Sequence, residues 1–468
     1  MAAGIALFGV NVPFWDDWAL VPALQRAAHG VVPWGELWAP QNQHRLVVPK
    51  LIMLGLAGLA RWDVRVDMWL CFGLAIGTFC VVYWAIGPGA GRAARPRGGA
   101  LALYVALFLF SAAAYDNWVW SWGIEWWLVA LAAAGAVGVM TRWRASWLAL
   151  LVGAALAATA TYSFGAGMLV WAIATLALAA LWRPLWRYLA VWCGLAGAAV
   201  GLYFWGWTAP ADMGFTLMHP LRAGLYVLVY LGSWARGPVY ALALLALHGL
   251  AGLGGSADLI RFGGAFPTLP AWVAAAFAVL PALIGLSGLA VAAIIHVALW
   301  HGGRERLERW LPSLLLLYFG LLCAALTALG RADEGVQEAL ASRYLTLSAL
   351  FWIGLLVPGI ELWRELGRCT SSGERRKAAS GRGWPWLAGH KRAVAAIATI
   401  AFAGLYVPTY AGGVVGMYER AAGLRAAGQA LQQVDTATDA QLSVLYPDAA
   451  FVRREAAVLR HLHLGPYG

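Results

Sequence analysis

The chain has 468 residues, of which 62% are hydrophobic and only 12% are charged, and its mean hydropathy is +0.69. Soluble domains have roughly 45–50% apolar and about 25% charged residues, so the composition excludes a soluble globular protein and indicates an integral membrane protein. The net charge of +11 does not predict a nucleic-acid partner, because most basic residues lie in connections between apolar runs. The five cysteines are scattered and form no Cys-x-x-Cys motif, so no disulfide framework or zinc site is expected.

Apolar runs long enough to cross about 30 Å of hydrocarbon recur along almost the whole chain. Because lipid leaves no water to satisfy the backbone, we expect an all-α, polytopic transmembrane helix bundle. The pattern predicts about 11 spans. The first, at 2–14, is inferred only, since a dozen residues are too few to cross a bilayer, and the others lie near 66–87, 100–115, 123–140, 146–161, 166–181, 188–206, 271–299, 311–329, 344–363 and 393–411.

Basic residues fill alternate connections between these spans. Five connections, at 92–97, 142–144, 183–187, 304–309 and 364–392, hold 18 of the 33 Lys and Arg residues. If the spans alternate, these connections share one side, which the positive-inside pattern identifies as cytoplasmic. The outward side then receives 15–65, 115–123, 161–166, 207–270, 330–343 and 412–468.

We expect one transmembrane domain at 1–411 and a short helical tail outside the cytoplasm at 412–468. The domain includes a first outer loop at 15–65 with juxtamembrane helices, a basic cytoplasmic loop at 364–392 and a candidate insertion at 237–270. The apolar segment 221–255 is interrupted by glycine and proline, so it makes either no crossing or two. The tail is too short for a typical independent domain and is expected to cover the outer cavity or to contact a partner.

The most distinctive motif follows the first apolar stretch and reads Pro13-Phe14-Trp15-Asp16-Asp17-Trp18. Aspartate is a preferred residue at a helix start, and tryptophan is common at membrane interfaces, so helix capping is one interpretation. Two adjacent acids are more than one cap needs. A carboxylate close to lipid has a raised proton affinity and is a credible general base, which makes Asp16 and Asp17 candidate catalytic residues.

Two further outward segments carry polar residues that suit a hydroxylated, anionic substrate. In the first outer loop, Asn42, His44 and Arg45 form a cluster of donors, although Arg45 also fits a cation that extends to the membrane surface. The segment 115–127 packs five tryptophans into ten residues, and an interfacial aromatic belt explains many of them. Sugar or prenyl stacking is the alternative, with candidate substrate contacts at Asn117, Trp118, Trp122 and Glu125.

The segment 330–344 joins two spans on the outer side and places Arg331 and Arg343 on either side of a turn that contains glycine. Guanidinium groups bind phosphate oxygens in a bidentate manner, so this pair is the candidate phosphate clamp, with Tyr344 beside it. Ion pairing with the nearby acids of the same segment is the competing interpretation.

The order of these parts resembles bacterial members of the C-type (GT-C) membrane glycosyltransferase superfamily. The similarity covers roughly 10–365 and rests on the outward acidic pair, on Asn42-x-His44-Arg45, on an Asn-Trp turn, and on late Gly-Arg and Ser-Arg-Tyr elements. Uncharacterised polytopic proteins with Pro-x-Trp-Asp-Glu-Trp, Asn-Glu-His-Arg and Ser-Arg-Tyr patterns are particularly similar. Asp17 and Gln43 each stand where glutamate is more usual, and the loss of an acid at Gln43 weakens a metal site there.

The resemblance implies an inverting glycosyltransferase of the bacterial cytoplasmic membrane that acts in glycan biosynthesis of the cell envelope. Its donor is a polyprenyl-phosphate sugar, and its acceptor is a lipid, glycan or protein at the outer face. By analogy, Asp16 is the general base, Asp17 orients the acceptor or shares that role, and Arg331 and Arg343 hold the leaving phosphate. Further donors to the phosphate are expected from Tyr344, His44 and Arg45.

Other classes remain open on the sequence. A transporter or flippase would share the composition but should place charged residues in mid-span, where few are found. A lipid-diphosphate-dependent polysaccharide polymerase or ligase would also use outward arginines, and a structural assembly subunit is a further alternative. No cofactor is predicted with certainty, because the acids either bind Mg²⁺ or Mn²⁺ or act without a metal.

Overall fold

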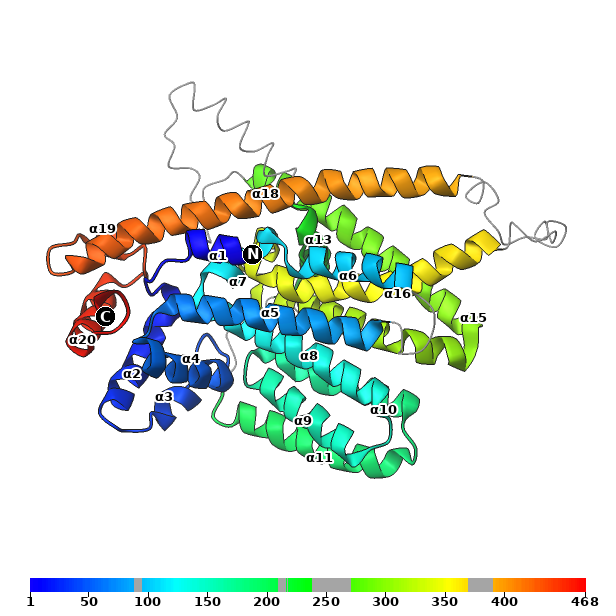
Figure 1. Ribbon diagram of the computed structural model, residues 1–468, viewed down its shortest axis with the longest axis horizontal. Coiled ribbons are helices and arrows are strands. Elements are labelled where there is room, and N and C mark those ends of the chain that lie inside the picture. The colour runs from blue at the N-terminus through cyan, green and yellow to red at the C-terminus, as the bar shows by residue number, and fades with distance from the viewer. Residues whose placement is uncertain (88–94, 209–215, 217, 238–270, 369–389) are drawn as a thin grey trace, which may run out of the picture.

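A computed structural model describes residues 1–87, 95–208, 216, 218–237, 271–368 and 390–468 (Figure 1). The regular elements of these residues are helices, and an isolated bridge joins Gln41 to His44. The expected insertion at 237–270 and the basic loop at 364–392 fall largely outside the described residues. The helices are α1 (Ala2–Phe8), α2 (Val21–Ala28), α3 (Trp34–Trp38), α4 (Val47–Ala60), α5 (Val64–Ile86), α6 (Arg95–Leu109), α7 (Asp116–Val119), α8 (Ile124–Arg142), α9 (Trp147–Thr161), α10 (Leu169–Leu181), α11 (Leu185–Phe204), α13 (Pro220–Gly232), α15 (Ala271–Arg331), α16 (Leu345–Arg368), α18 (Lys391–Gln432), α19 (Asp439–Leu442) and α20 (Ala449–Leu462).

Helix α8 forms the centre of the bundle. Its most apolar window is 94% buried inside the protein, and it packs against α5, α9, α10, α15 and α16. Small residues make these approaches close, because a Cβ atom on Gly138 would lie 2.2 Å from the ring of Trp84 and one on Gly135 would lie 3.1 Å from Leu156. The half of α8 toward Arg142 therefore packs closely against α5 and α9.

The helical membrane class is confirmed for the described residues. Six helices are long and apolar enough to cross a membrane, and four more apolar helices are shorter. The predicted total of about 11 spans is not confirmed, because several predicted runs lie on those shorter helices. Helix α1 has seven residues and is only about 10 Å long at 1.5 Å per residue, so it does not by itself cross a bilayer.

The basic connections gather at one end of the bundle. Arg144, after α8, pairs with Glu308 of α15 at 2.7 Å, and Arg306 pairs with Glu365 of α16 at 2.9 Å. The Tyr188 hydroxyl of α11 donates to the Ala145 carbonyl at 2.8 Å, which brings the 183–187 connection to the same end. These contacts lie where α15 turns at Gly303, a position with a φ of 67°.

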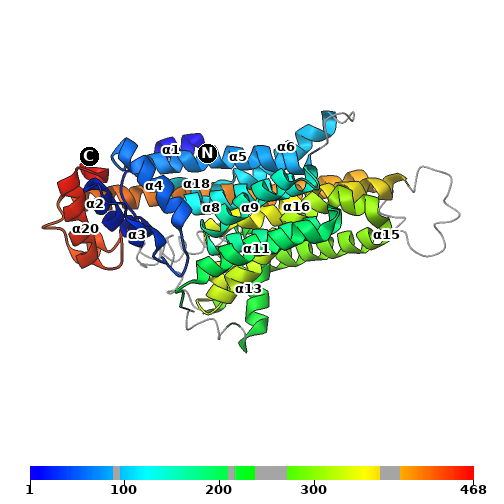
Figure 2. The same ribbon diagram turned by 90° about the horizontal axis from the view of Figure 1, so that it is seen from below.

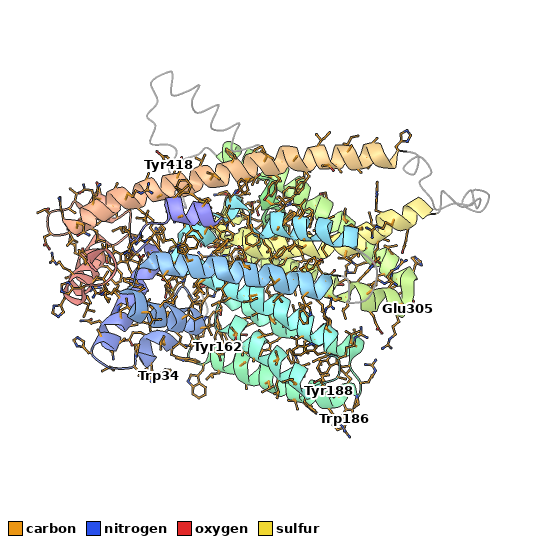
Figure 3. All side chains as sticks on the ribbon, viewed as in Figure 1. Trp34, Tyr162, Trp186, Tyr188, Glu305 and Tyr418 are labelled. Carbon is orange, nitrogen blue, oxygen red and sulfur yellow. The ribbon has the colours of Figure 1, made fainter. Side chains whose placement is uncertain are left out.

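The opposite end carries the first outer loop and the C-terminal residues, and both ribbon views place α2, α3 and α20 there (Figures 1 and 2). Exposed Trp34 and Trp186 lie toward opposite ends of the bundle (Figure 3), as tryptophans at two membrane surfaces would. We call the end with α2, α3 and α20 the site end, and the end with the α15 turn the basic end.

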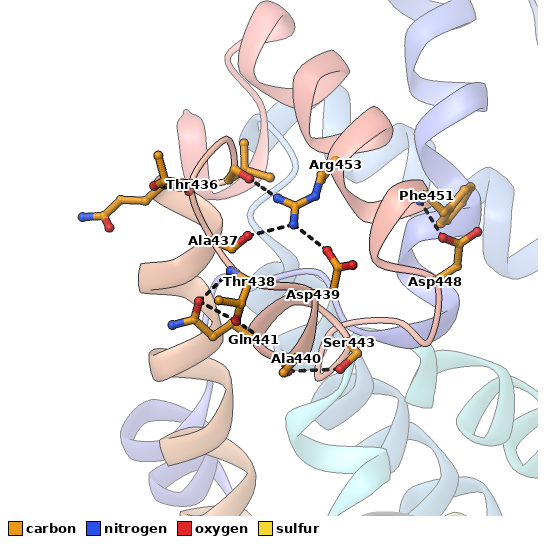
Figure 4. A network of polar contacts seen from close by, with 12 residues as sticks. Thr436, Ala437, Thr438, Asp439, Ala440, Gln441, Ser443, Asp448, Phe451 and Arg453 are labelled. Atoms are coloured by element: carbon orange, nitrogen blue, oxygen red, sulfur yellow. Dashed lines mark hydrogen bonds and ion pairs between the residues drawn. The ribbon is translucent and has the colours of Figure 1, made fainter.

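The C-terminal tail begins inside a continuous helix. Helix α18 spans residues 391–432, so the expected boundary between 411 and 412 does not separate two folded units. Beyond it, Arg453 of α20 donates to Asp439 at 2.6 Å and to the Ala437 carbonyl at 2.7 Å, which closes the tail into a compact turn (Figure 4). This turn packs on α2, and the Gly465 amide donates to the Arg61 carbonyl at 2.8 Å.

Candidate active site

The two adjacent aspartates point in different directions from a short 3₁₀ helix, η1 (Trp15–Leu20). Asp17 is 1% exposed, and its carboxylate accepts a hydrogen bond from the Phe14 amide at 2.9 Å and another from the Ser121 hydroxyl. These contacts close the turn, as the capping interpretation predicts for one of the two acids. Burial raises the pKa of Asp17 to about 7. Both carboxylate oxygens of Asp17 accept hydrogen bonds from within the protein, so Asp17 stabilises the turn.

Asp16 is the acid that faces the other candidate residues. Its carboxylate accepts a hydrogen bond from the Asn42 amide at 2.8 Å, and its backbone carbonyl accepts one from Gln41 at 3.3 Å. Burial raises the pKa of Asp16, while the Asn42 hydrogen bond and the positive charges of Arg343 and Arg331 act in the opposite direction. Thus Asp16 lies within electrostatic range of both arginines.

His44 and Arg45 are neighbours in the sequence with separate roles in the structure. The His44 ring packs on Phe164 with centroids 4.4 Å apart. Burial and the nearby Arg331 lower the pKa of His44 to about 4, so its imidazole is neutral at physiological pH. A Cβ atom on Gly165 would lie 2.7 Å from the His44 Nδ1 atom, which explains why glycine follows Phe164.

Arg45 is 2% exposed, and backbone carbonyls occupy its guanidinium. It donates to the carbonyl of Trp38 at 2.7 Å, to that of Tyr203 at 2.5 Å and to that of Trp205, and it stacks on the Trp38 ring with 4.6 Å from Cζ to the centroid. The sequence suggested Arg45 as a phosphate donor. The structure instead uses it to attach the first outer loop to the end of α11, because a buried guanidinium needs acceptors for its N–H groups.

The two clamp arginines come from the end of α15 and from η8 (Ser342–Tyr344). Arg331 pairs with Glu334, and Arg343 pairs with Glu338. These ion pairs are what the competing interpretation, pairing with acids of the same segment, predicts. Both arginines remain partly open to solvent, with side chains 39% and 28% exposed.

Buried groups hold the Arg343 turn in place. The Asn117 side-chain amide donates to the Arg343 carbonyl and to the Thr346 hydroxyl, both at 2.8 Å. The Tyr344 ring lies under the Arg343 guanidinium at 5.0 Å and packs against Trp126 with centroids 5.6 Å apart. Asn117 thus orients the backbone of Arg343, and the Tyr344 ring packs beneath its guanidinium.

The remaining aromatic candidates are interior residues. Trp118 is fully buried, donates to the Ser111 carbonyl at 2.9 Å and packs on Trp127, and Trp122 is 1% exposed. Neither ring has an exposed face on which a sugar could stack, so the structure does not support sugar stacking on Trp118 or Trp122. Glu125, in the first turn of α8, is 7% exposed and lies within electrostatic range of Asp16 and Arg343.

The donor set of this site does not fit a divalent cation. In the described ranges, no group of three or more histidine, cysteine, aspartate and glutamate side chains could hold a metal ion. Asp16 faces guanidinium groups and a carboxamide, whereas Mg²⁺ and Ca²⁺ sites gather several oxygen ligands.

Four residues of the site end were not singled out from the sequence. Gln41 and Phe164 contact Asp16 and His44, Trp126 packs beneath the clamp, and Tyr203 anchors Arg45. Only the positions of Gln41, Phe164 and Trp126 next to Asn42, Gly165 and Glu125 in the sequence could have indicated these three residues, and no neighbouring motif marks Tyr203. No family model, no curated protein and no solved structure matches this chain.

Proposed function

We propose that this protein is a membrane glycosyltransferase that moves a sugar from a polyprenyl-phosphate donor to an acceptor hydroxyl, with Asp16 as general base. The observation that carries the proposal is the position of Asp16, one acid within electrostatic range of two partly exposed arginines, Arg331 and Arg343, from separate turns. A base on one side and guanidinium groups on the other match the two charges that change during glycosyl transfer.

In the proposed reaction the acceptor oxygen attacks the anomeric carbon of the sugar, and Asp16 takes the proton of the acceptor hydroxyl. The bond between the anomeric carbon and the phosphate oxygen breaks, and the electron pair leaves with the polyprenyl phosphate. Arg331 and Arg343 stabilise the negative charge that accumulates on the phosphate, more strongly in the transition state than in the ground state. Attack opposite to the leaving group inverts the anomeric configuration.

Charge balance favours a monophosphate over a diphosphate donor. Each clamp arginine already has one carboxylate partner, Glu334 or Glu338, so the two arginines contribute little excess positive charge. A phosphodiester carries one negative charge and needs less compensation than a diphosphate, whose burial without counter-charges is costly. This argument supports the transferase over a lipid-diphosphate-dependent polymerase or ligase.

The distribution of charge along the bundle also favours a surface enzyme over a transporter. Transporters bind their substrates near the middle of the membrane, but α8 has no charged residue between Glu125 at its outer start and Arg142 at its other end. The charged candidates gather at the site end, opposite the basic end. By the positive-inside pattern, the site end faces away from the cytoplasm.

The test is transfer of labelled sugar from a panel of polyprenyl-phosphate sugars in proteoliposomes. We expect a donor-dependent product from the wild type, and a loss of about 10²–10⁴-fold in turnover for Asp16→Asn, the usual contribution of a general base. Asp435→Asn, at an exposed position of the C-terminal tail, makes the same chemical change outside the site and should keep wild-type turnover. A wild type that transfers no sugar from any donor but moves labelled lipid across the bilayer would refute the proposal.

A further inference from the structure

Arg420, on α18, reaches from the C-terminal helix into the site end. Its side chain is 10% exposed, and its Nη2 atom donates to the Asp116 carboxylate at 2.8 Å. Its Cζ atom also lies over the Phe14 ring, 4.3 Å from the centroid. One buried guanidinium therefore contacts two segments that are about a hundred residues apart in the chain.

The ion pair with Asp116 connects Arg420 to the turn that carries Arg343. The second oxygen of Asp116 accepts a hydrogen bond from the hydroxyl of Ser342, the residue before Arg343. The next residue, Asn117, donates to the Arg343 carbonyl at 2.8 Å. Arg420 thus orients the carboxylate that holds the start of the Arg343 turn.

The contact of Arg420 with Phe14 connects it to the turn that carries Asp16. The Phe14 amide donates to Asp17 at 2.9 Å, and the Phe14 carbonyl accepts from the Trp120 indole at 3.0 Å. Both contacts fix the chain two residues before Asp16. A guanidinium stacked on the Phe14 ring limits the movement of this turn.

The tail makes a second contact beside the base. The Trp15 amide donates to the carbonyl of Leu445, between α19 and α20, at 2.7 Å. Trp15 itself has a φ of 51°, a left-handed conformation that bulky residues adopt only when their surroundings hold them there. The C-terminal residues thus support the backbone immediately before Asp16.

We propose that Arg420 is a positioning residue that ties the Asp16 turn to the Arg343 turn, and that the C-terminal helices are a working part of the catalytic unit. This inference rests on the proposed function, since it concerns the spacing between its base and its phosphate clamp. Arg420 does not touch the reacting atoms. It sets the separation of two groups that must act on opposite sides of one anomeric carbon, and a displacement of about 1 Å can cost about 10²-fold in rate.

The experiment compares Arg420→Ala with Arg425→Ala in full-length protein in proteoliposomes. Arg425 lies on the same helix and donates to the Leu7 carbonyl at 2.8 Å, so its variant removes a tail contact outside the site. We expect Arg420→Ala to lower kcat by about 10–100-fold with little change in KM for the donor, and methylguanidinium added to the assay to restore part of the rate. We expect Arg425→Ala to keep the wild-type kcat. Equal kcat values for the two variants would overturn the proposal.

A second variant separates positioning from simple charge balance, because Arg420→Ala leaves the buried Asp116 charge without its partner and can destabilise the protein. The double variant Asp116→Asn with Arg420→Met removes both charges and keeps most of the volume. If Arg420 positions the two turns, the double variant has near wild-type thermal stability and a low kcat. Recovery of the wild-type kcat would show that Arg420 only neutralises Asp116 and would overturn the proposal.

Hydrogen exchange gives a readout that does not depend on the reaction. We expect Arg420→Ala to accelerate amide exchange at both 14–20 and 342–346, and Arg425→Ala to leave both segments as in the wild type. This pattern supports the tie between the two turns even if the wild type turns over no sugar donor, the result that would refute the proposed function alone. Unchanged exchange in Arg420→Ala at either segment would overturn the tie itself.

Discussion

The two ends of the helix bundle use arginine in opposite ways. At the basic end, Arg144 and Arg304 both pair with Glu308, and Arg304 is 65% exposed. At the site end, the Arg420 side chain is 10% exposed and that of Arg343 is 28% exposed, and both contact turns that carry polar side chains. Water screens the exposed pairs of the basic end, whereas the Arg420–Asp116 pair is buried and is screened little, so this site-end arginine can hold its neighbouring turns in a fixed position.

The largest expected contrast between the ends is in catalysis. We expect Arg343→Ala to lower kcat/KM for a polyprenyl-phosphate sugar by about 10²–10³-fold, the usual cost of removing one donor that stabilises transition-state charge. Arg304→Ala, at the basic end, should stay within about twofold because its exposed pairing with Glu308 is weak. Initial rates of sugar transfer at matched protein density measure both. Similar losses for the two variants would mean that Arg343 has no special role in the reaction.

Buried charge at the site end should also be visible in stability. Asp17 has a pKa of about 7 in the fold against 3.8 when unperturbed, so folding favours its protonated form, and the associated stability is present below pH 4 and lost as pH rises to 7. Asp17→Asn does not titrate. We therefore expect its free energy of unfolding, relative to wild type, to rise between pH 4 and pH 8 by up to about 4 kcal/mol, given about 1.4 kcal/mol per pH unit.

Denaturation in mixed micelles at several pH values measures this difference. The constant cost of replacing one carboxylate oxygen by an amide nitrogen shifts all values equally and leaves the slope intact. Asp439→Asn, at an exposed tail position, is the matched control for the change from carboxylate to carboxamide. A pH-independent difference for Asp17→Asn would mean that Asp17 is ionised in the fold at low cost.

The class of the protein and the cluster at the site end follow from the sequence, because both depend on composition and on which loops share a side. Asp16 and His44 come from the segment 15–65 and Arg331 and Arg343 from 330–343, two segments that the sequence predicts on the same side, and electrostatic coupling connects them in the structure. The alternation of apolar spans predicts which loops share a side of the membrane, and this prediction does not require knowing how the helices pack. The number of membrane spans could not be predicted from the sequence in the same way, because helix length and burial vary along the apolar runs.

The roles of adjacent residues could not be predicted in the same way. Asp16 faces the arginines while Asp17 caps the turn, and the difference depends on the φ of Trp15 and on the hydroxyl of Ser121, far away in the chain. Arg45 looks like a ligand for phosphate until the carbonyls at the end of α11 are seen to occupy it. Arg420 lies 304 positions from Asp116, and no local pattern reveals that pair.

The pH dependence of sugar transfer distinguishes Asp16 from His44 as the group whose ionisation controls the rate. Burial raises the pKa of Asp16 and lowers that of His44 to about 4. A general base must be ionised, so kcat/KM should fall as pH falls through the raised pKa of Asp16, about tenfold per pH unit below it. His44→Gln should keep the same profile above the pKa of His44, about 4, because the imidazole takes up a proton only at lower pH. A profile that shifts with His44→Gln would assign the ionisation to His44.

The smallest effect is expected at the basic end. Arg144 and Glu308 are 2.7 Å apart but 44% and 29% exposed, so water and salt screen their attraction, and an exposed pair of this kind contributes about 0–1 kcal/mol. Arg144→Ala should lower the midpoint of thermal unfolding slightly at low salt and hardly at all at high salt, with sugar transfer unchanged. A large, salt-resistant loss would show that Arg144 helps to hold α8 against the α15 turn, and that the two ends differ less in their use of arginine than their exposures suggest.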